Sequence, residues 1–269
     1  MTIENAFNNR LLALQTPDLT RMLLQNTRIL PESLISVYPG FRKYRESADN
    51  SLLYLKEPTE PIQKHPRVIL QIMGGSAAGK NTIMELLKEK LSQNCTNHTT
   101  IITATTRKQR PVEPDDAHIW LDRKQFIAEK KDRKFIEAIH QGFEWYGTRK
   151  EELDQALESD SSIIFWEAEI YGLPFMKKYM EQRAIEGKPS IPIVTIYLLN
   201  GESIRDYAKR IWRYRSFEFW WRFPKAMAEI KRAVGNVDAF LLNRPTDDPK
   251  LTEVIDTLMK YLSENVEGM

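Results

Sequence analysis

A glycine-rich loop between a predicted strand and a predicted helix constrains this chain more than any other feature. The loop reads Gly74-Gly75-Ser76-Ala77-Ala78-Gly79-Lys80-Asn81-Thr82 and directly follows the run VILQIM. Backbone N–H groups of such a loop point at phosphate oxygens, the helix N-terminus adds partial positive charge, and Lys80 can bridge two phosphates. A turn without a ligand would need neither the second glycine nor the lysine. The loop therefore predicts a site for a nucleoside triphosphate such as ATP, formed by these nine residues.

One position of the loop bears on the metal. Asn81 stands where the common pattern has a hydroxyl that reaches Mg²⁺, and Thr82 follows at once. We expect ATP and Mg²⁺ as cofactors, with Asn81 as the only metal ligand that the motif suggests.

From about residue 67 the sequence alternates β-branched runs with helical periodicity, which is typical of a parallel sheet with crossover helices. Helices are expected over 81–91, from 123 to about 129, and over 251–262, and a capping-box spacing from Thr148 to Glu151 predicts another that runs to about 157. The predicted strands span residues 68–73, 100–105, 162–166, 193–198 and 237–242.

Residues 1–66 differ from the rest, because helical periodicity over 11–24 is followed by five prolines. We predict a partly helical N-terminal extension over 1–66 and an α/β domain over 67–265.

Composition and charge exclude several classes. No apolar run approaches the roughly 20 residues of a membrane span, and the start has an early acid and no uninterrupted apolar segment. The single cysteine, Cys95, cannot form an internal disulfide. A net charge of +2 is too small to indicate nucleic acid. We expect a cytoplasmic protein that binds neither membrane nor nucleic acid.

Charge is skewed in one segment, residues 204–232, which carries nine Lys or Arg against three acids. Such a segment requires an anionic partner or an acidic neighbouring surface.

A second anion site is predicted where the strand over 100–105 ends. Arg107 and Arg110 lie three residues apart, a spacing that lets two planar guanidinium groups clamp one phosphate. The segments Phe135-Ile-Glu137 and Tyr146-Gly-Thr148 follow, and Glu167 and Glu169 precede Gly172.

In this order and spacing the sequence resembles the guanylate kinase family, whose members follow the P-loop with TTRxxRP, FxE, YYGT and an acidic strand end before a glycine. The resemblance covers about residues 67–262. It implies a P-loop NTPase fold, that is, a parallel sheet flanked by helices with a small nucleotide-binding subdomain (about 103–150) and a helical lid (about 204–232). The resemblance also accounts for Asn81 in the sequence Gly-Lys-Asn-Thr, since many nucleoside monophosphate kinases read Gly-Lys-x-Thr.

The resemblance implies phosphorylation of GMP by ATP, with roles for matching residues. Arg107, Arg110 and Tyr146 would hold the acceptor phosphate. Glu137 would accept hydrogen bonds from guanine N1–H and N2–H₂, which adenine cannot supply. Thr103 and Thr148 would lie near the base, and Glu167 and Glu169 would replace the family's aspartates. The implied catalytic residues are Lys80, Arg107, Arg210 and Arg222, and Asn243 would lie near adenine.

Two features depart from the family. Ile119 replaces a phosphate-contacting tyrosine, and residues 214–223 replace a polar lid tip with aromatic side chains. Such a run is more often packed than exposed, here against the extension or a second subunit, with base stacking as the alternative.

Two other functions stay open. Ribose 1,5-bisphosphate phosphokinases share the fold and a His-Ile pair such as His118-Ile119, although Glu137 and the two arginines argue against this activity. A noncatalytic guanylate-kinase-like interaction module usually has an eroded P-loop, whereas Lys80 and both framing glycines are intact here.

Overall fold

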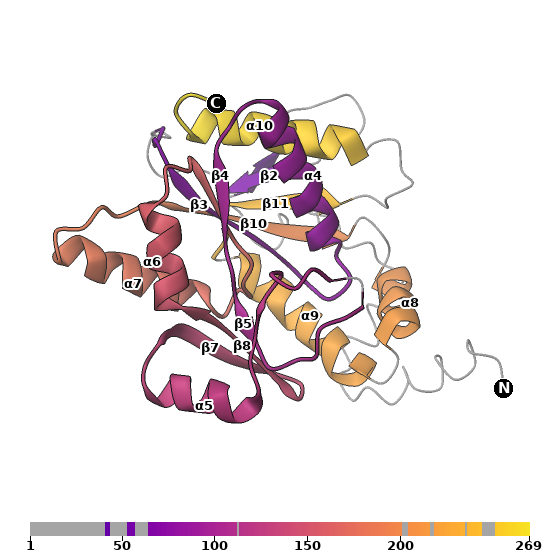
Figure 1. Ribbon diagram of the computed structural model, residues 1–269. Helices are drawn as coiled ribbons and strands as arrows, with labels where there is room; N and C mark the ends of the chain where they lie inside the picture. The colour runs from indigo at the N-terminus through magenta and orange to yellow at the C-terminus, as the bar shows by residue number, and fades with distance from the viewer. Residues whose placement is uncertain are drawn as a thin grey trace. The chain divides into compact units, whose positions relative to one another are not determined.

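The computed structural model describes residues 41–43, 53–56, 64–111, 113–200, 204–215, 218–234, 236–243 and 251–269. The fold is a mixed α/β fold with a parallel central sheet and flanking helices (Figure 1). The chain forms two compact units. The first comprises Met1–Glu57, Gly74–Gly79 and Leu198–Val254, and the second comprises Pro58–Met73, Lys80–Tyr197 and Ile255–Met269.

Four neighbouring strands of the larger sheet, most of whose residues belong to the second unit, follow the order β10-β3-β9-β4. Their bounds are Ile193–Asn200 for β10, Val68–Gly74 for β3, Ile163–Trp166 for β9 and His98–Ile101 for β4. Both β3 and β4 pair with β9 in parallel. Six successive residues of β3 are buried, as expected for a strand covered on both faces.

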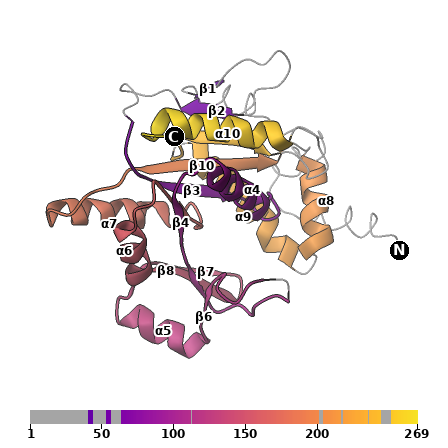
Figure 2. The ribbon, with the colours of Figure 1, turned by 45° about the horizontal axis from the view of Figure 1, so that its top comes forward.

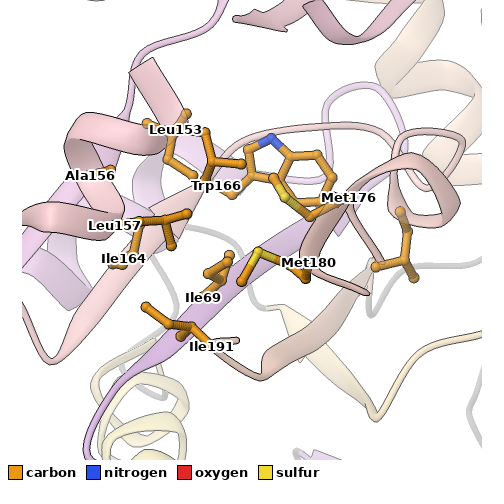
Figure 3. Packing of buried hydrophobic residues seen from close by; sticks show 11 residues of the cluster. Ile69, Leu153, Ala156, Leu157, Ile164, Trp166, Met176, Met180 and Ile191 are labelled. Carbon is orange, nitrogen blue, oxygen red and sulfur yellow. The ribbon is translucent and has the colours of Figure 1, made fainter. Parts of the chain in front are cut away.

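Helices α6 (Lys150–Glu158) and α7 (Leu173–Ile185) lie side by side in both ribbon views (Figures 1 and 2). Their apolar residues converge with Ile69 of β3 and Trp166 of β9 on one buried cluster (Figure 3). The second unit also contains helix α4 (Lys80–Gln93) and most of helix α10 (Leu251–Asn265), which begins in the first unit. The cluster anchors Trp166, whose indole reaches the candidate site.

A second, smaller sheet with the order β6-β5-β8-β7 also belongs to the second unit. Helix α5 lies beside it (Figure 2), and Phe126 of α5 stacks on Phe135 of β7 at 4.5 Å between ring centroids. The bounds are Ala104–Thr105 for β5, Ile119–Trp120 for β6, Arg123–Lys131 for α5, Phe135–Gln141 for β7 and Glu144–Arg149 for β8.

In the first unit, β2 (Leu53–Lys56) pairs antiparallel with both β1 (Phe41–Lys43) and β11 (Ala239–Asn243). Helices α8 (Ile204–Arg215) and α9 (Phe219–Val234) form the segment predicted as a helical lid. Phe219 and Phe223 are fully buried and stack at 5.5 Å, which confirms packing for these two members of the aromatic run.

The predicted strand over 100–105 is wrong in one respect. Strand β4 ends at Ile101, and Ala104–Thr105 forms β5 of the other sheet. A continuous β-branched run cannot indicate that its two halves pair with different partners.

The capping box at Thr148 is also wrong. Thr148 is still in β8, and the N-cap residue of α6 is Arg149, which makes no side-chain capping bond. By contrast, a helix starts at Arg123 as predicted, with a capping box between Asp122 and Gln125.

The structure describes only part of the N-terminal extension predicted over residues 1–66. Strands β1 and β2 were not predicted, and the helical periodicity over 11–24 lies outside the described residues.

Candidate functional site

The glycine-rich loop is tightly packed within the first unit. Gly79 has φ +83°, a left-handed conformation that favours glycine. A Cβ on Gly75 would lie 2.3 Å from the Tyr207 hydroxyl, and one on Gly79 would lie 2.4 Å from Nδ2 of Asn243. A side chain at either position would therefore displace Tyr207 or Asn243, and at Gly79 it would also strain the backbone.

Three side chains hold this loop. The Tyr207 hydroxyl donates to the Ser76 carbonyl at 2.8 Å, and Asn243 Nδ2 donates to the Ala78 carbonyl at 2.6 Å. Arg222 Nη1 donates to Ser76 Oγ at 3.3 Å. Arg222 also forms an ion pair with Glu218. Burial raises the pKa of Tyr207, and the charge of Arg210 has a smaller effect in the opposite direction. The described contact of Asn243 is thus with the loop backbone.

Lys80, Asn81 and Thr82 form the start of α4, whose first turn holds no acidic residue. The described residues contain no cluster of three or more His, Cys, Asp or Glu side chains that could hold a metal. The start of α4 itself offers the neutral side-chain oxygens of Asn81 and Thr82. This set fits Mg²⁺ only as an ion that keeps water and substrate phosphate oxygens as most of its ligands.

In the second unit, the two arginines of the predicted phosphate clamp share a carboxylate. Arg107 Nη1 and Nη2 donate to the two Glu113 oxygens at 2.6 and 2.7 Å, and Arg110 Nη1 lies 3.4 Å from Glu113 Oε1. The hydrogen bond from Arg107 lowers the pKa of Glu113 to about 2, and the Arg110 backbone N–H and charge act in the same direction. Glu113 therefore orients both guanidinium groups.

Tyr146 lies next to the guanidinium group of Arg107. Burial alone would lower the pKa of Arg107, but hydrogen bonds and charge from Glu113 and then Tyr146 outweigh it and raise that pKa. The structure thus brings together Arg107, Arg110 and Tyr146, as the resemblance implies. Ile119, in β6, adds no hydroxyl to this group.

Glu137 is buried, with 5% of its surface exposed. Thr148 Oγ1 donates to Glu137 Oε1 at 2.8 Å, while Oε2 is buried and has no hydrogen-bond partner within the described residues. Burial raises the pKa of Glu137 to about 7, the bond from Thr148 opposes this, and the charge of Glu169 reinforces it. A carboxyl with one unsatisfied buried oxygen is suited to receive an N–H donor from a ligand.

Thr103 is also buried, and its hydroxyl lies 3.0 Å from Nδ1 of His118. Burial lowers the pKa of His118, and the charge of Glu167 works in the opposite direction. His118 can therefore orient the Thr103 hydroxyl.

Glu167 and Glu169 follow β9, which ends at Trp166, so strand alternation does not set their directions. The charge of Glu169 acts on Glu137, whereas that of Glu167 acts on Lys88 and His118. The charges of the two glutamates thus influence different neighbouring residues.

Sequence reasoning missed four residues of these contacts. Glu113 could have been found as an acid six residues after Arg107 in a basic loop. Trp166, whose indole donates to Thr148, and Tyr207 act through one polar atom of an aromatic side chain, which no local pattern marks. His118 was noted only for its pairing with Ile119.

Fold and loop together define an α/β protein of the P-loop class. The guanylate kinase family model matches residues 65–182. Over these residues the chain is similar to the guanylate kinase family.

A guanylate kinase from Mycoplasmopsis synoviae is 28% identical over 155 residues, which are 56% of this chain and 72% of that protein. A guanylate kinase from Helicobacter pylori (strain ATCC 700392 / 26695) is 32% identical over 118 residues, 41% of this chain and 52% of the relative. The chain thus spans only about half the length of that relative. The crystal structure of guanylate kinase from Anaplasma phagocytophilum has the same fold, with a TM-score of 0.53 and 18% identity over 75% of this chain and 87% of the other.

In the part of the chain that the structure describes, no helix is long and apolar enough to cross a membrane.

Proposed function

We propose that this chain is an ATP-dependent nucleoside monophosphate kinase that transfers the γ-phosphoryl group to GMP. The observation that carries the choice of acceptor is Glu137, a buried carboxyl whose Oε2 has no hydrogen-bond partner in the described part of the chain. Guanine presents two adjacent N–H donors to such a group, whereas adenine would leave the carboxyl unsatisfied, which costs binding energy.

The donor side of the proposal rests on residues 74–82. The loop backbone and Lys80 would hold the triphosphate of ATP, and Asn81 or Thr82 would supply an oxygen to Mg²⁺. When bound, Mg²⁺ neutralises phosphate charge. Arg222, already hydrogen-bonded to Ser76 of the loop, and Arg210 would stabilise negative charge on the transferred group.

The acceptor side rests on Arg107 and Arg110, which Glu113 holds in one place. Their guanidinium groups, with the Tyr146 hydroxyl, would bind the GMP phosphate through charge-assisted hydrogen bonds. Because phosphoryl transfer needs little covalent chemistry from the protein, holding the acceptor oxygen in line with the γ-phosphorus is their contribution.

An acceptor panel tests this function. The protein is assayed with ATP and Mg²⁺ against GMP, dGMP, AMP, UMP and ribose 1,5-bisphosphate, with product identified by chromatography. We expect turnover with GMP, and a fall of at least about 100-fold in kcat for Lys80→Ala, since Lys80 contacts the transferred group's charge. Turnover of ribose 1,5-bisphosphate instead of GMP would show a different kinase. No turnover with any acceptor, together with no ATP binding, would indicate a noncatalytic module.

A further inference from the structure

Trp166 makes a polar contact that core packing does not require. It lies at the end of β9, is fully buried, and belongs to the apolar cluster of α6 and α7 (Figure 3). Its indole Nε1 nevertheless donates to Thr148 Oγ1 at 2.9 Å. Thr148 in turn donates to Glu137 Oε1 at 2.8 Å. A chain of two buried hydrogen bonds therefore leads from the core to the Glu137 carboxyl.

The direction of this chain is fixed by chemistry. An indole N–H can only donate, so Thr148 Oγ1 must accept from Trp166. A hydroxyl has one proton, and with a carboxylate at 2.8 Å that proton is directed at Glu137 Oε1. The oxygen Oε1 is thereby engaged, and Oε2 is left as the buried acceptor.

The Glu137 side chain and the Trp166 ring also lie close to the same glycine, Gly172. A Cβ on Gly172 would lie 3.4 Å from Glu137 Cγ, 3.4 Å from the Trp166 ring and 3.3 Å from the Glu169 carbonyl oxygen. Glu137 and Trp166 thus both pack against the backbone at Gly172. Gly172 therefore lets the Glu137 side chain and the Trp166 ring approach the same stretch of backbone.

We propose that Trp166 is a positioning residue for acceptor recognition: through Thr148 it orients the Glu137 carboxylate so that Oε2 meets the N–H donors of the acceptor base. This inference rests on the proposed function. Trp166 touches no substrate in this account, so its effect belongs to the binding of GMP and not to the transfer step.

The test is Trp166→Phe, which keeps an aromatic ring and removes the N–H donor. Loss of one hydrogen bond predicts a rise in KM for GMP of about 3- to 10-fold, with kcat and KM for ATP within about twofold of the parent. The midpoint of the pH dependence of KM for GMP should move upward, because a less well oriented hydroxyl stabilises the carboxylate less. A purely structural role for Trp166 would not move that midpoint.

Trp145→Phe is the matched control. Trp145 belongs to the same second unit, and its Nε1 is buried without a hydrogen-bond partner among the described residues. Removing this N–H should leave KM for GMP and its pH midpoint unchanged.

The double variant Thr148→Val/Trp166→Phe should bind GMP no worse than Thr148→Val alone, since Trp166 acts only through that hydroxyl.

Three outcomes decide the inference. An unchanged KM for GMP and pH midpoint in Trp166→Phe overturns it, and so does full additivity in the double variant, while the proposed function stands in both cases. If the parent protein does not turn over GMP, the proposed function fails, and the carboxyl titration of Glu137 is followed by ¹³C NMR without ligand. An upward shift in Trp166→Phe then supports the positioning role, and an unmoved titration overturns it.

Discussion

The ionisation of Glu137 is the residue-scale property with the clearest consequence. Its pKa is raised to about 7, first by burial, so the carboxyl changes charge within the working range of most assays. Only the carboxylate can accept two N–H groups; the protonated form presents an O–H donor to one of them. Protonation as the pH falls through 7 should therefore weaken recognition of guanine.

We predict that KM for GMP falls by about 10-fold between pH 6 and pH 8, as expected for a required base with a pKa near 7. Steady-state kinetics at saturating ATP measures this. The GMP phosphate also titrates near pH 6, so Glu137→Gln provides the correction: it retains the phosphate's titration and loses that of the carboxyl. A parent profile that matches the Glu137→Gln profile would show that Glu137 does not control GMP binding in this range.

At the scale of elements, helix α8 supports the glycine-rich loop through one hydroxyl. Tyr207 is buried and donates to the Ser76 carbonyl. Tyr207→Phe keeps the ring but leaves a loop carbonyl without this donor. We expect KM for ATP to rise by about 3- to 10-fold, the equivalent of one hydrogen bond, with KM for GMP nearly unchanged.

Tyr179→Phe is the control for this prediction. The Tyr179 hydroxyl bonds to Asp154 and joins α7 to α6, so its loss should lower the unfolding temperature without raising KM for ATP. Equal effects of the two variants on KM for ATP would mean that Tyr207 acts through general stability.

Local elements could largely be predicted, whereas pairings between distant segments could not. The helix after the loop and the strand over 162–166 follow from periodicity within single segments. By contrast, the continuous run over 100–105 hid a change of sheet, and Thr148 was misread as a cap because its partner Glu137 lies on the neighbouring strand β7. Arg107 was expected at the site from its spacing to Arg110, and Glu137 from the family resemblance. Glu113 and Trp166 emerged only from contacts in three dimensions.

At the scale of the whole molecule, the N-terminal segment adds strands to the fold of the first unit. Strand β2 lies between β1 and β11, with Leu55 opposite Ala239. Neither strand could be predicted, because runs of three or four residues carry almost no period-two signal. The partner of β2 in β11 is moreover nearly 200 positions away in the sequence. The segment is therefore a part of the sheet that the motifs alone do not indicate.

Leu55→Pro tests this contribution, because proline in an inner strand removes a backbone donor and restricts the chain. We predict a loss of about 2 kcal/mol or more in the free energy of unfolding. Leu55→Val, which suits a strand, should cost under about 1 kcal/mol. Chemical denaturation followed by circular dichroism compares them, and equal stability of the two variants would argue against a structural role for β2.

The central claim is that a P-loop kinase selects guanine through Glu137. Its most direct test is the ratio of kcat/KM for GMP to that for AMP, in the parent and in Glu137→Gln. We predict that the parent favours GMP by about 100-fold or more, and that Glu137→Gln lowers kcat/KM for GMP while leaving that for AMP within a few fold. A parent without preference for GMP, or a variant that loses both activities equally, would contradict the claim.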